Sequence, residues 1–277
     1  MPTVEANGVS IYAESFGMPG DPPLLLINGL TSQLLSWPQE FCEAFVDRGF
    51  FVIRFDNRDV GLSSKFVDGP EYTLSDMADD CVAVLEHFDA APAHVMGISM
   101  GGMIAQTLAI EHSDVVASLV SYASSTGAPE VGLPTAEAVE AILAPEPANR
   151  EEAAANGVAG KKVWGTPETW SEEEWGEFSA RNFDRSPPNG AGPRQYAAIL
   201  ASGNRDGELA KIDIPTLVIH GSADPLITSE GGKHTAAVIP NARYVEIEGM
   251  RHDLPITEWP HIVQLVTMHA AQAATAS

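Results

Sequence analysis

Short apolar runs alternate with helical repeats through the first 122 residues of the chain. A run of about five apolar residues bounded by turn residues is typical of a buried strand, whereas apolar residues spaced three or four apart indicate a helix. The predicted strands are LLLIN at 24–28, FFVIRF at 50–55, AHVMGI at 93–98 and VASLVSY at 116–122. The predicted helices between them cover 36–49, 73–88 and 100–112. This alternation favours an α/β fold, in which a mostly parallel sheet is flanked by helices on both faces.

Two further pairs of strands bring the predicted sheet to eight strands. Residues 3–15 hold two strand segments around Asn7-Gly8, a hairpin signal because both residues tolerate positive φ. Strand patterns return in TLVIHG at 216–221 and RYVEIEG at 243–249, and a helical pattern over 256–273 follows them.

The middle of the chain, from Gly127 to about Gly207, shows no clear strand. It holds proline-punctuated helical segments at 135–143, 149–163, 171–183 and 193–203. We therefore predict that residues 1–127 and 208–277 form one α/β core domain. Residues 128–207 are predicted to be a helical cap, or lid, inserted into it.

The charge of the chain narrows the classes of partner. There are 15 Lys plus Arg against 38 Asp plus Glu, which gives a formal net charge of −23 at pH 7. Such a surface repels phosphate backbones and anionic membranes, so we expect a small-molecule substrate and neither a nucleic acid nor a membrane as partner. The charge does not identify the substrate or the oligomeric state.

The start of the sequence and the cysteines favour a cytoplasmic location. The first 14 residues have neither the basic start nor the apolar run of a signal peptide, and no segment approaches a membrane span. Cys42 and Cys81 lie in predicted helices without metal-ligand spacing. We expect them to be reduced thiols in the core.

The segment HVMGISMGGMIA at 94–105 joins a predicted strand to a predicted helix through Gly97, Ser99 and Gly101. In that context G-x-S-x-G is the nucleophile elbow, a sharp turn that presents the serine hydroxyl above the sheet. A structural turn without chemistry would also explain the glycines. Because a serine hydroxyl is a poor nucleophile alone, the catalytic interpretation requires a base and a group that orients it.

Two histidines come late in the predicted sheet, where a base could approach Ser99. His94 is excluded because it lies on the same strand as Ser99, about 16 Å away at roughly 3.3 Å per residue. His220 still belongs to a strand pattern, whereas His252 follows the last strand on a glycine-led loop. His252 is therefore the better base.

Asp224 is the predicted acid. It follows the strand TLVIHG and precedes His252, which gives the chain order Ser, Asp, His expected for such a triad. Asp224 before Pro225 is also the pattern of a helix N-cap, and one residue could serve both purposes. Asp253 is too close in sequence to His252 to reach around its ring.

The oxyanion of an acyl-transfer reaction needs hydrogen-bond donors. We expect one to be the backbone N–H of Met100, at the head of the helix after Ser99. The second is the N–H of Leu30, in the segment NGL at 28–30. Asn28-Gly29 could instead form a hairpin, but no alternating return strand follows it.

The predicted cap is rich in aromatic residues, of which Trp164, Trp170 and Phe183 are our candidates for the substrate pocket. Packing of the cap onto the core is an alternative role for them. The turn DNRDVGLSS at 56–64 gathers charged residues, and we expect it to be a salt-bridged structural loop. Since the sequence has no P-loop, dinucleotide fingerprint, H-E-x-x-H or Cys/His cluster, nothing calls for a cofactor or a metal.

The chain resembles the α/β-hydrolase superfamily over nearly its whole length. The matching stretches are LLLINGL, FDNRDVGLSS, VMGISMGGMIAQTLA, PTLVIHGSADPLI and IEGMRHDLP. Within the superfamily it is most similar to bacterial carboxylesterases around the aclacinomycin methylesterases, which hydrolyse a methyl ester on a polyketide. Many relatives carry His-Gly where this chain has Asn28-Gly29.

The resemblance implies a triad of Ser99, Asp224 and His252 beneath a helical cap. The expected function is that of a cofactor-independent serine hydrolase that cleaves carboxylic esters through an acyl-enzyme. The alternatives are other reactions on the same scaffold, namely lactone opening, C–C hydrolysis or perhydrolysis resembling cofactor-free haloperoxidases, and a ligand-binding protein without turnover. Because the base must be a neutral imidazole, we expect activity to fall on acidification.

Overall fold

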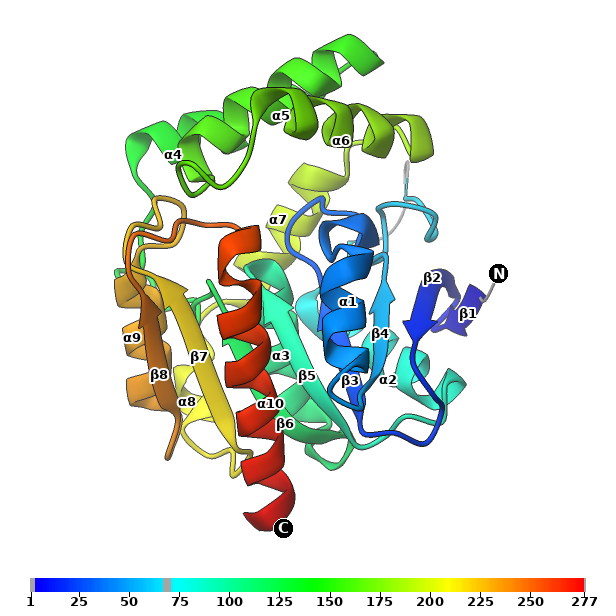
Figure 1. The fold of residues 1–277 in the computed structure, drawn as a ribbon, viewed down its shortest axis with the longest axis vertical. Coiled ribbons are helices and arrows are strands. Elements are labelled where there is room, and N and C mark those ends of the chain that lie inside the picture. Colours follow the sequence, from blue (N-terminus) through cyan, green and yellow to red (C-terminus); the bar gives the residue numbers. More distant parts are fainter. Residues whose placement is uncertain (1–2, 67–70, 277) are drawn as a thin grey trace.

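A single eight-stranded sheet forms the centre of the molecule. The structure, a computed structural model, describes residues 3–66 and 71–276. The strand order is β1-β2-β4-β3-β5-β6-β7-β8 (Figure 1). The strands are β1 (Thr3–Ala6), β2 (Val9–Phe16), β3 (Pro23–Ile27), β4 (Phe51–Phe55), β5 (Ala93–Ile98), β6 (Val116–Tyr122), β7 (Thr216–Gly221) and β8 (Arg243–Ile247). The predicted α/β-hydrolase fold, with its mostly parallel eight-stranded sheet, is confirmed.

Only the first strands of the sheet are antiparallel. β1 pairs antiparallel with β2, and β2 with β4, whereas every later pair is parallel. The turn between β1 and β2 is the predicted hairpin, with positive φ at Asn7 and Gly8. Parallel strands end at the same edge of a sheet, so the carboxyl ends of β3, β5, β7 and β8 lie together.

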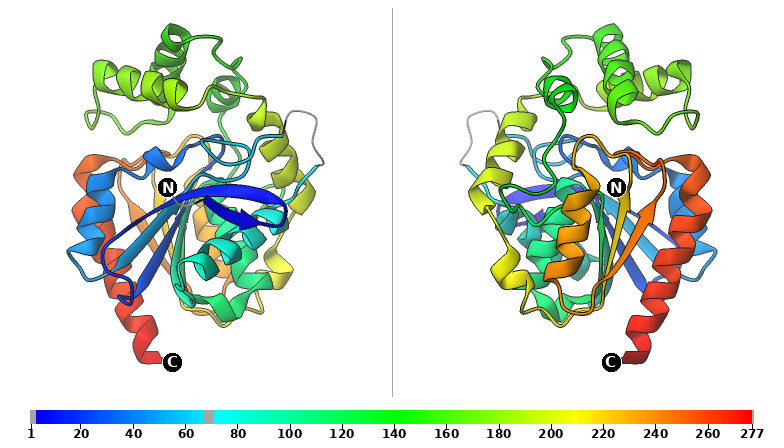
Figure 2. Two further views of the ribbon diagram at one scale, coloured as in Figure 1. Left: turned by 90° about the vertical axis from the view of Figure 1, so that its right-hand side faces the viewer. Right: turned by 90° about the vertical axis from the view of Figure 1, so that its left-hand side faces the viewer.

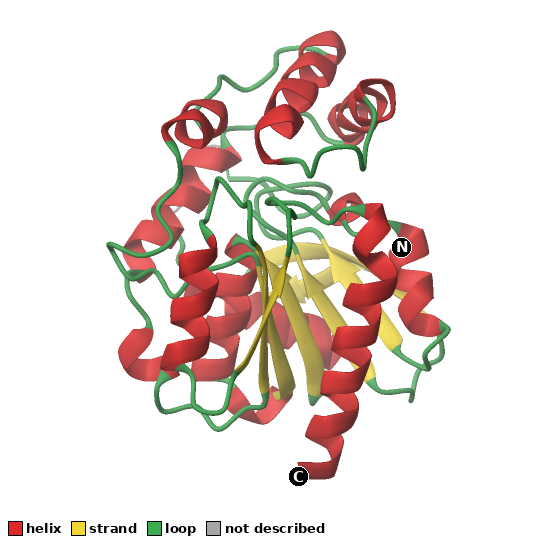
Figure 3. Ribbon diagram, turned by 60° about the vertical axis from the view of Figure 1, so that its left-hand side comes forward, coloured by secondary structure: helices red, strands yellow, loops and turns green. Residues whose placement is uncertain are grey.

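Helices cover both faces of the sheet, as Figures 2 and 3 show. One face carries α1 (Gln39–Val46) and α10 (Trp259–Ala276), and the other carries α2 (Leu74–His87), α3 (Met100–Glu111) and α9 (Ser229–Val238). The shorter 3-10 helices are η1 (Leu34–Ser36), η2 (Ser113–Val115) and η3 (Ile256–Glu258). No helix in the part of the chain that the structure describes is long and apolar enough to cross a membrane.

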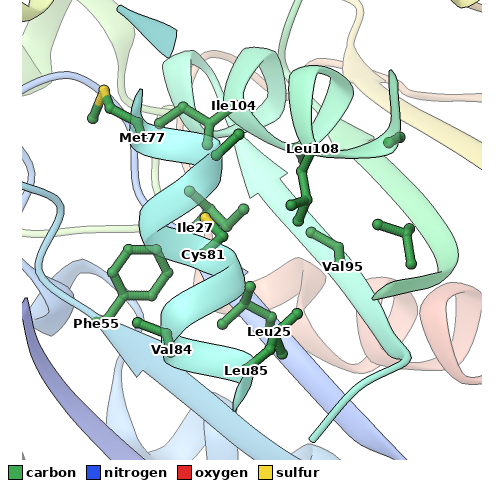
Figure 4. Close-up of a cluster of buried hydrophobic side chains, with 14 of the residues drawn as sticks. Leu25, Ile27, Phe55, Met77, Cys81, Val84, Leu85, Val95, Ile104 and Leu108 are labelled. Carbon is green, nitrogen blue, oxygen red and sulfur yellow. The ribbon is translucent and has the colours of Figure 1, made fainter. Parts of the chain in front are cut away.

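The central strands are apolar without alternation because both of their faces are covered. Val95 of β5 and Leu25 of β3 pack with Cys81 and Leu85 of α2 and with Leu108 of α3 in one core cluster (Figure 4). The second cluster lies between the opposite face of the sheet and α1 with α10.

Both cysteines belong to these clusters. Cys81 lies in the cluster of α2 and α3, and Cys42 lies in the cluster of α1 and α10. Both are buried and free, as predicted.

Four helices lie beyond the carboxyl ends of the parallel strands, which we call the cap helices (Figures 1 and 2). They are α4 (Ala136–Ile142), α5 (Arg150–Trp164), α6 (Glu172–Arg185) and α7 (Ala191–Ser202). The side chains of Thr135, Asn149 and Ser171 cap the first three of them and explain where they begin.

The last cap helix differs from the others because it also packs on the core. Ala198 of α7 belongs to the cluster of α2 and α3, and Ser202 Oγ accepts a hydrogen bond from Leu74 N at the start of α2. The short helix α8 (Asp206–Leu209) then returns the chain to β7.

The sequence pattern missed α9. Its sequence, SEGGKHTAAV, holds two glycines, which lower helix propensity. The structure shows why they are there: a Cβ on Gly232 would lie 2.5 Å from His220 Nδ1, and one on Gly231 would lie 2.9 Å from Ile227 Cγ2. The glycines let α9 approach β7 and its loop closely.

Candidate active site

Ser99 lies at the turn between β5 and α3, in a strained conformation. Its φ of 57° and ψ of −122° are unusual for a residue with a side chain. The turn is held by a hydrogen bond from Ser99 N to Tyr122 O (2.9 Å) and by one from Ser124 Oγ to Ser99 O (2.7 Å). This is the strand-turn-helix geometry that the sequence predicted.

The glycines around Ser99 are required by close backbone contacts. A Cβ on Gly97 would lie 2.0 Å from Gly101 O, and a Cβ on Gly101 would lie 2.2 Å from Ile27 O. A Cβ on Gly102 would lie 2.6 Å from Ser124 Cβ. No side chain fits at these positions, so the start of α3 packs directly against β5 and the end of β3.

The segment at 28–30 lies beside Ser99, as expected for an oxyanion loop. A Cβ on Gly29 would lie 3.2 Å from Ser99 Cβ and 3.8 Å from Ser99 Oγ. No hydrogen-bond partner is found for Leu30 N–H among the described residues. Met100 is the first residue of α3, where N–H groups have no partner within the helix. Of the two predicted donors, Met100 follows Ser99 directly, and Leu30 follows the glycine that lies against Ser99.

Asn28 anchors this loop through its amide and carbonyl groups. Its Nδ2 donates to Phe55 O (3.2 Å), and its backbone carbonyl accepts from Asn57 Nδ2 (3.0 Å). The alternative of a hairpin at Asn28-Gly29 is wrong, because no strand returns after it and α1 follows.

His252 and Asp224 meet above the ends of β8 and β7. His252 Nδ1 lies 2.7 Å from Asp224 Oδ2, and both residues are buried. Asp224 Oδ1 accepts from Leu226 N (2.8 Å) and Ile227 N (3.0 Å), which fixes the carboxylate. No helix begins at Asp224, so the interpretation of Asp224 as a helix N-cap is wrong. The residue caps a turn, and the nearest helix starts at Ser229.

A second imidazole contacts the same carboxylate. His220, at the buried end of β7, places Nε2 2.7 Å from Ile227 O and 3.2 Å from Asp224 Oδ2. These acceptors require the Nε2–H tautomer. His220 therefore supports Asp224 through the nitrogen that a base would use, which agrees with the choice of His252 as the candidate base.

The electrostatic environment keeps Asp224 ionised. Burial raises the pKa of its carboxyl group, but the imidazoles of His252 and His220 and their hydrogen bonds outweigh burial, so the pKa is lowered from its ordinary value. A carboxylate that stays charged at neutral pH can orient an imidazole and stabilise the imidazolium.

The contact between nucleophile and base is open in this structure. Among the described residues, no hydrogen bond joins Ser99 Oγ to the His252 imidazole. Such contacts are often long before substrate binds and tighten during the reaction.

The predicted pocket residues occupy different positions. Trp164 ends α5, and its carbonyl accepts the His252 N–H (3.0 Å). Trp170 lines a cavity of about 370 Å³ together with Arg251. Phe183 is half-buried on α6. The structure thus brings Trp164 and Trp170 to the loop that carries His252.

The charged turn at 56–64 is salt-bridged, but not within itself. Asp56 pairs with Arg185 of α6 (2.7 Å), and Asp59 pairs with Arg194 of α7 (2.6 Å). Arg58 reaches back to Asp80 of α2 (2.6 Å). The turn therefore links the cap helices to the sheet.

Metal ligands do not gather in the described part of the chain. Within residues 3–66 and 71–276 no group of three or more His, Cys, Asp or Glu side chains is arranged to hold a metal ion.

A family model for the alpha/beta hydrolase fold matches residues 22–258. The chain belongs to the α/β-hydrolase family. Rhodomycin D methylesterase from Streptomyces peucetius is 32% identical to it, with 99% of each chain aligned. 3-Oxoadipate enol-lactonase 2 from Acinetobacter baylyi is 29% identical, over 83% of this chain and 82% of that one. The predicted resemblance to the methylesterase group is confirmed.

Solved structures share the fold of this chain. An esterase from Rhodococcus sp. ECU1013 has a TM-score of 0.76 and 26% identity, over 97% of each chain. A meta-cleavage product hydrolase from Pseudomonas fluorescens has a TM-score of 0.81 at 18% identity, over 99% of this chain and 98% of that one.

Proposed function

We propose that this α/β-hydrolase cleaves carboxylic esters with Ser99 as nucleophile, His252 as base and Asp224 as the group that orients the base. The observation that carries the proposal is the 2.7 Å contact between His252 Nδ1 and the buried Asp224 carboxylate, at the edge of the sheet that also holds Ser99 in a strained elbow. Ester hydrolysis also agrees with the methylesterases that align over the whole chain.

The reaction has two halves. His252 Nε2 takes the Ser99 hydroxyl proton as Oγ attacks the ester carbonyl, and the alcohol leaves with that proton. A water molecule then loses a proton to the same nitrogen and attacks the acyl-enzyme. The bond between the acyl carbon and Ser99 Oγ breaks, and His252 Nε2 returns the proton to Oγ, which releases the acid and restores Ser99. Asp224 fixes the Nδ1–H tautomer and stabilises the imidazolium in both halves.

The backbone N–H groups of Leu30 and Met100 hold the oxyanion. The Leu30 N–H has no partner among the described residues, so its hydrogen bond is free for the transition state. A donor aimed at an oxyanion in this way is worth about 3 kcal/mol of transition-state stabilisation.

We propose a methyl ester of a bulky acid as substrate class. The support is the alignment with two rhodomycin D methylesterases at 32% identity, each over 99% of both chains. The cap helices would cover this acid, with Trp164, Trp170 and Phe183 as lining residues and residues 128–207 acting as the lid.

The test is hydrolysis of p-nitrophenyl acetate, butyrate and octanoate by the native protein and by Ser99→Ala, with mass spectrometry after fluorophosphonate treatment. We expect turnover and one label on Ser99 in the native protein, and neither in the variant. A folded native protein with neither turnover nor labelling would favour the ligand-binding alternative. A second panel compares the methyl, ethyl and benzyl esters of one polycyclic acid with an enol-lactone, which separates methylesterase from lactonase activity.

A further inference from the structure

The loop that carries His252, here called the histidine loop (residues 248–255), caps the end of helix α5. Arg251 Nη1 donates to Lys162 O (3.1 Å) and Val163 O (3.0 Å), and His252 N donates to Trp164 O (3.0 Å). The last carbonyls of a helix have no partner within it. Here the histidine loop supplies those partners, so the candidate base and a cap helix are joined through the backbone of the base itself.

A buried ion pair completes this junction. Lys161 Nζ of α5 lies 2.7 Å from Asp253 Oδ2, and the two side chains are 6% and 5% exposed. Thr166 donates to the same carboxylate from its N–H (3.0 Å) and its hydroxyl (2.6 Å), and Thr166 Oγ1 accepts from Arg251 N (2.9 Å). The Lys161 ammonium also lies 4.1 Å from the centre of the Trp175 ring.

The pair is electrically neutral as a unit, but each member alone would act on the base. Asp253 follows His252 directly in the chain, and burial weakens the screening of its charge by water. An unpaired carboxylate there would favour the imidazolium form of His252, whereas an unpaired ammonium would disfavour it. None of these contacts takes part in the triad.

We propose that Lys161 and Asp253 are positioning residues for the base. Together with Thr166 they hold the histidine loop against the cap helices, and their mutual neutralisation leaves no net charge on the residue next to the base. This proposal rests on the proposed role of His252.

Other charged or titratable groups lie on the elements packed against the loop. They are Asp224, His220, Arg251, Tyr122, Glu258, Lys162, Glu168 and Glu172. All of them stay unchanged in the variants below, so a shift in the pH profile reports on the Lys161–Asp253 pair.

The experiment measures kcat/KM for p-nitrophenyl acetate, and the rate of fluorophosphonate labelling of Ser99, between pH 5 and pH 9. The variants are Lys161→Met, Asp253→Asn and the double variant. We expect Lys161→Met to move the acid limb of both profiles to higher pH by about one unit, because Asp253 is then uncompensated. Asp253→Asn moves it to lower pH, and the double variant returns it close to the native position.

Arg150→Met is the matched control. Arg150 is on the same helix and pairs with Glu177 (2.8 Å) and Asp184 (2.9 Å) of α6, but it is exposed and does not contact the histidine loop. The substitution removes one positive charge and the ion pairs between α5 and α6, and we expect the acid limb to stay at the native pH.

Thr166→Val keeps the test decisive if Lys161→Met does not fold. It removes the hydroxyl that joins Asp253 to Arg251 without a change in charge, so kcat falls while the acid limb stays in place. Asp253→Asn must still move the limb to lower pH.

The proposal is overturned if the native protein shows Ser99-dependent turnover and the acid limb stays at the native pH in both Asp253→Asn and any folded Lys161→Met. Absence of that turnover in the native protein defeats the proposed function instead.

Discussion

The turn around Ser99 and the histidine loop meet at the same edge of the sheet, but they are held there by different contacts. Gly97, Gly101 and Gly102 let the backbones of β5, α3 and β3 touch, so Ser99 is positioned by the shape of the core. The histidine loop is positioned by polar contacts from α5 and from Thr166 just after it, which lie about ninety positions away in the sequence. A disturbance of the cap helices should therefore affect the base more than the nucleophile.

The largest expected effect comes from Asp224→Asn, which removes the carboxylate that orients His252. The amide cannot fix the Nδ1–H tautomer of His252, so we expect kcat to fall by about 10⁴ while KM changes little. Steady-state kinetics measure it. The control is Asp213→Asn, which removes one exposed carboxylate just before β7. A fall of less than tenfold would mean that Asp224 does not orient the base.

Gly97→Ala tests the nucleophile side. The new Cβ would lie 2.0 Å from Gly101 O, a backbone atom that cannot move alone. We expect the free energy of unfolding to fall by about 3 kcal/mol or more, measured by urea denaturation. Gly207→Ala, on the short helix α8, is the control, because its Cβ would enter open space. Equal stability of the two variants would show that the elbow is not shape-limited.

His94→Gln helps to distinguish two causes of lost activity at low pH, namely unfolding of the protein and protonation of the base. His94 lies at the start of β5, hydrogen-bonded to Ser118 Oγ (2.8 Å), and burial lowers its pKa to about 4, with a smaller effect from His269. Between the ordinary histidine pKa of about 6.5 and pH 4, the unfolded chain binds a proton that the folded chain does not.

Native stability should therefore fall as the pH drops through that window, by about 3 kcal/mol in total from this residue. In His94→Gln the dependence of stability on pH, measured by urea denaturation, becomes flatter. If activity falls at a pH where the native protein is still folded, the loss belongs to the base. An unchanged slope in the variant would contradict the assignment to His94.

Gln195→Met gives the smallest expected effect and tests the oxyanion side. Gln195 of α7 is fully buried; its Oε1 accepts from Thr31 N (2.8 Å), and its Nε2 donates to Arg58 O (3.1 Å). Loss of these bonds frees the loop next to the Leu30 donor, so we expect kcat to fall about tenfold. Gln272→Met, on the exposed face of α10, is the control. A native kcat in Gln195→Met would mean that α7 does not help to position the oxyanion loop.

The same contrast explains what the sequence could and could not predict. The elbow is local: the strand at 93–98, the serine and its glycines are contiguous, and the structure has β5 at those residues. Asp224 and His252 could be ordered because each follows a strand. These predictions used periodicity, the direction of parallel strands, the glycine-led loop before His252 and the chain order Ser, Asp, His that such a triad follows.

Contacts between distant side chains carry no such signal. Lys161 and Asp253 are 92 residues apart, and nothing in KKV or RHD shows that their charges meet in the interior. Gln195 belongs to a helix pattern that gives no sign of its burial. The sequence presents His220 as one of two possible bases, but its role as a second partner of Asp224 depends on the loop at 222–227 folding back over β7.

The capping of α5 by the histidine loop also limits how chimeric proteins could be built from members of this family. Replacement of residues 136–186 by the helices of a relative would leave Arg251, His252 and Asp253 without the carbonyls, ammonium and hydroxyl that they bind here. A chimera that is meant to change substrate range would then also disturb the base. A chimera should therefore transfer residues 248–255 together with the cap helices, although β7 and β8 separate the two segments in the sequence.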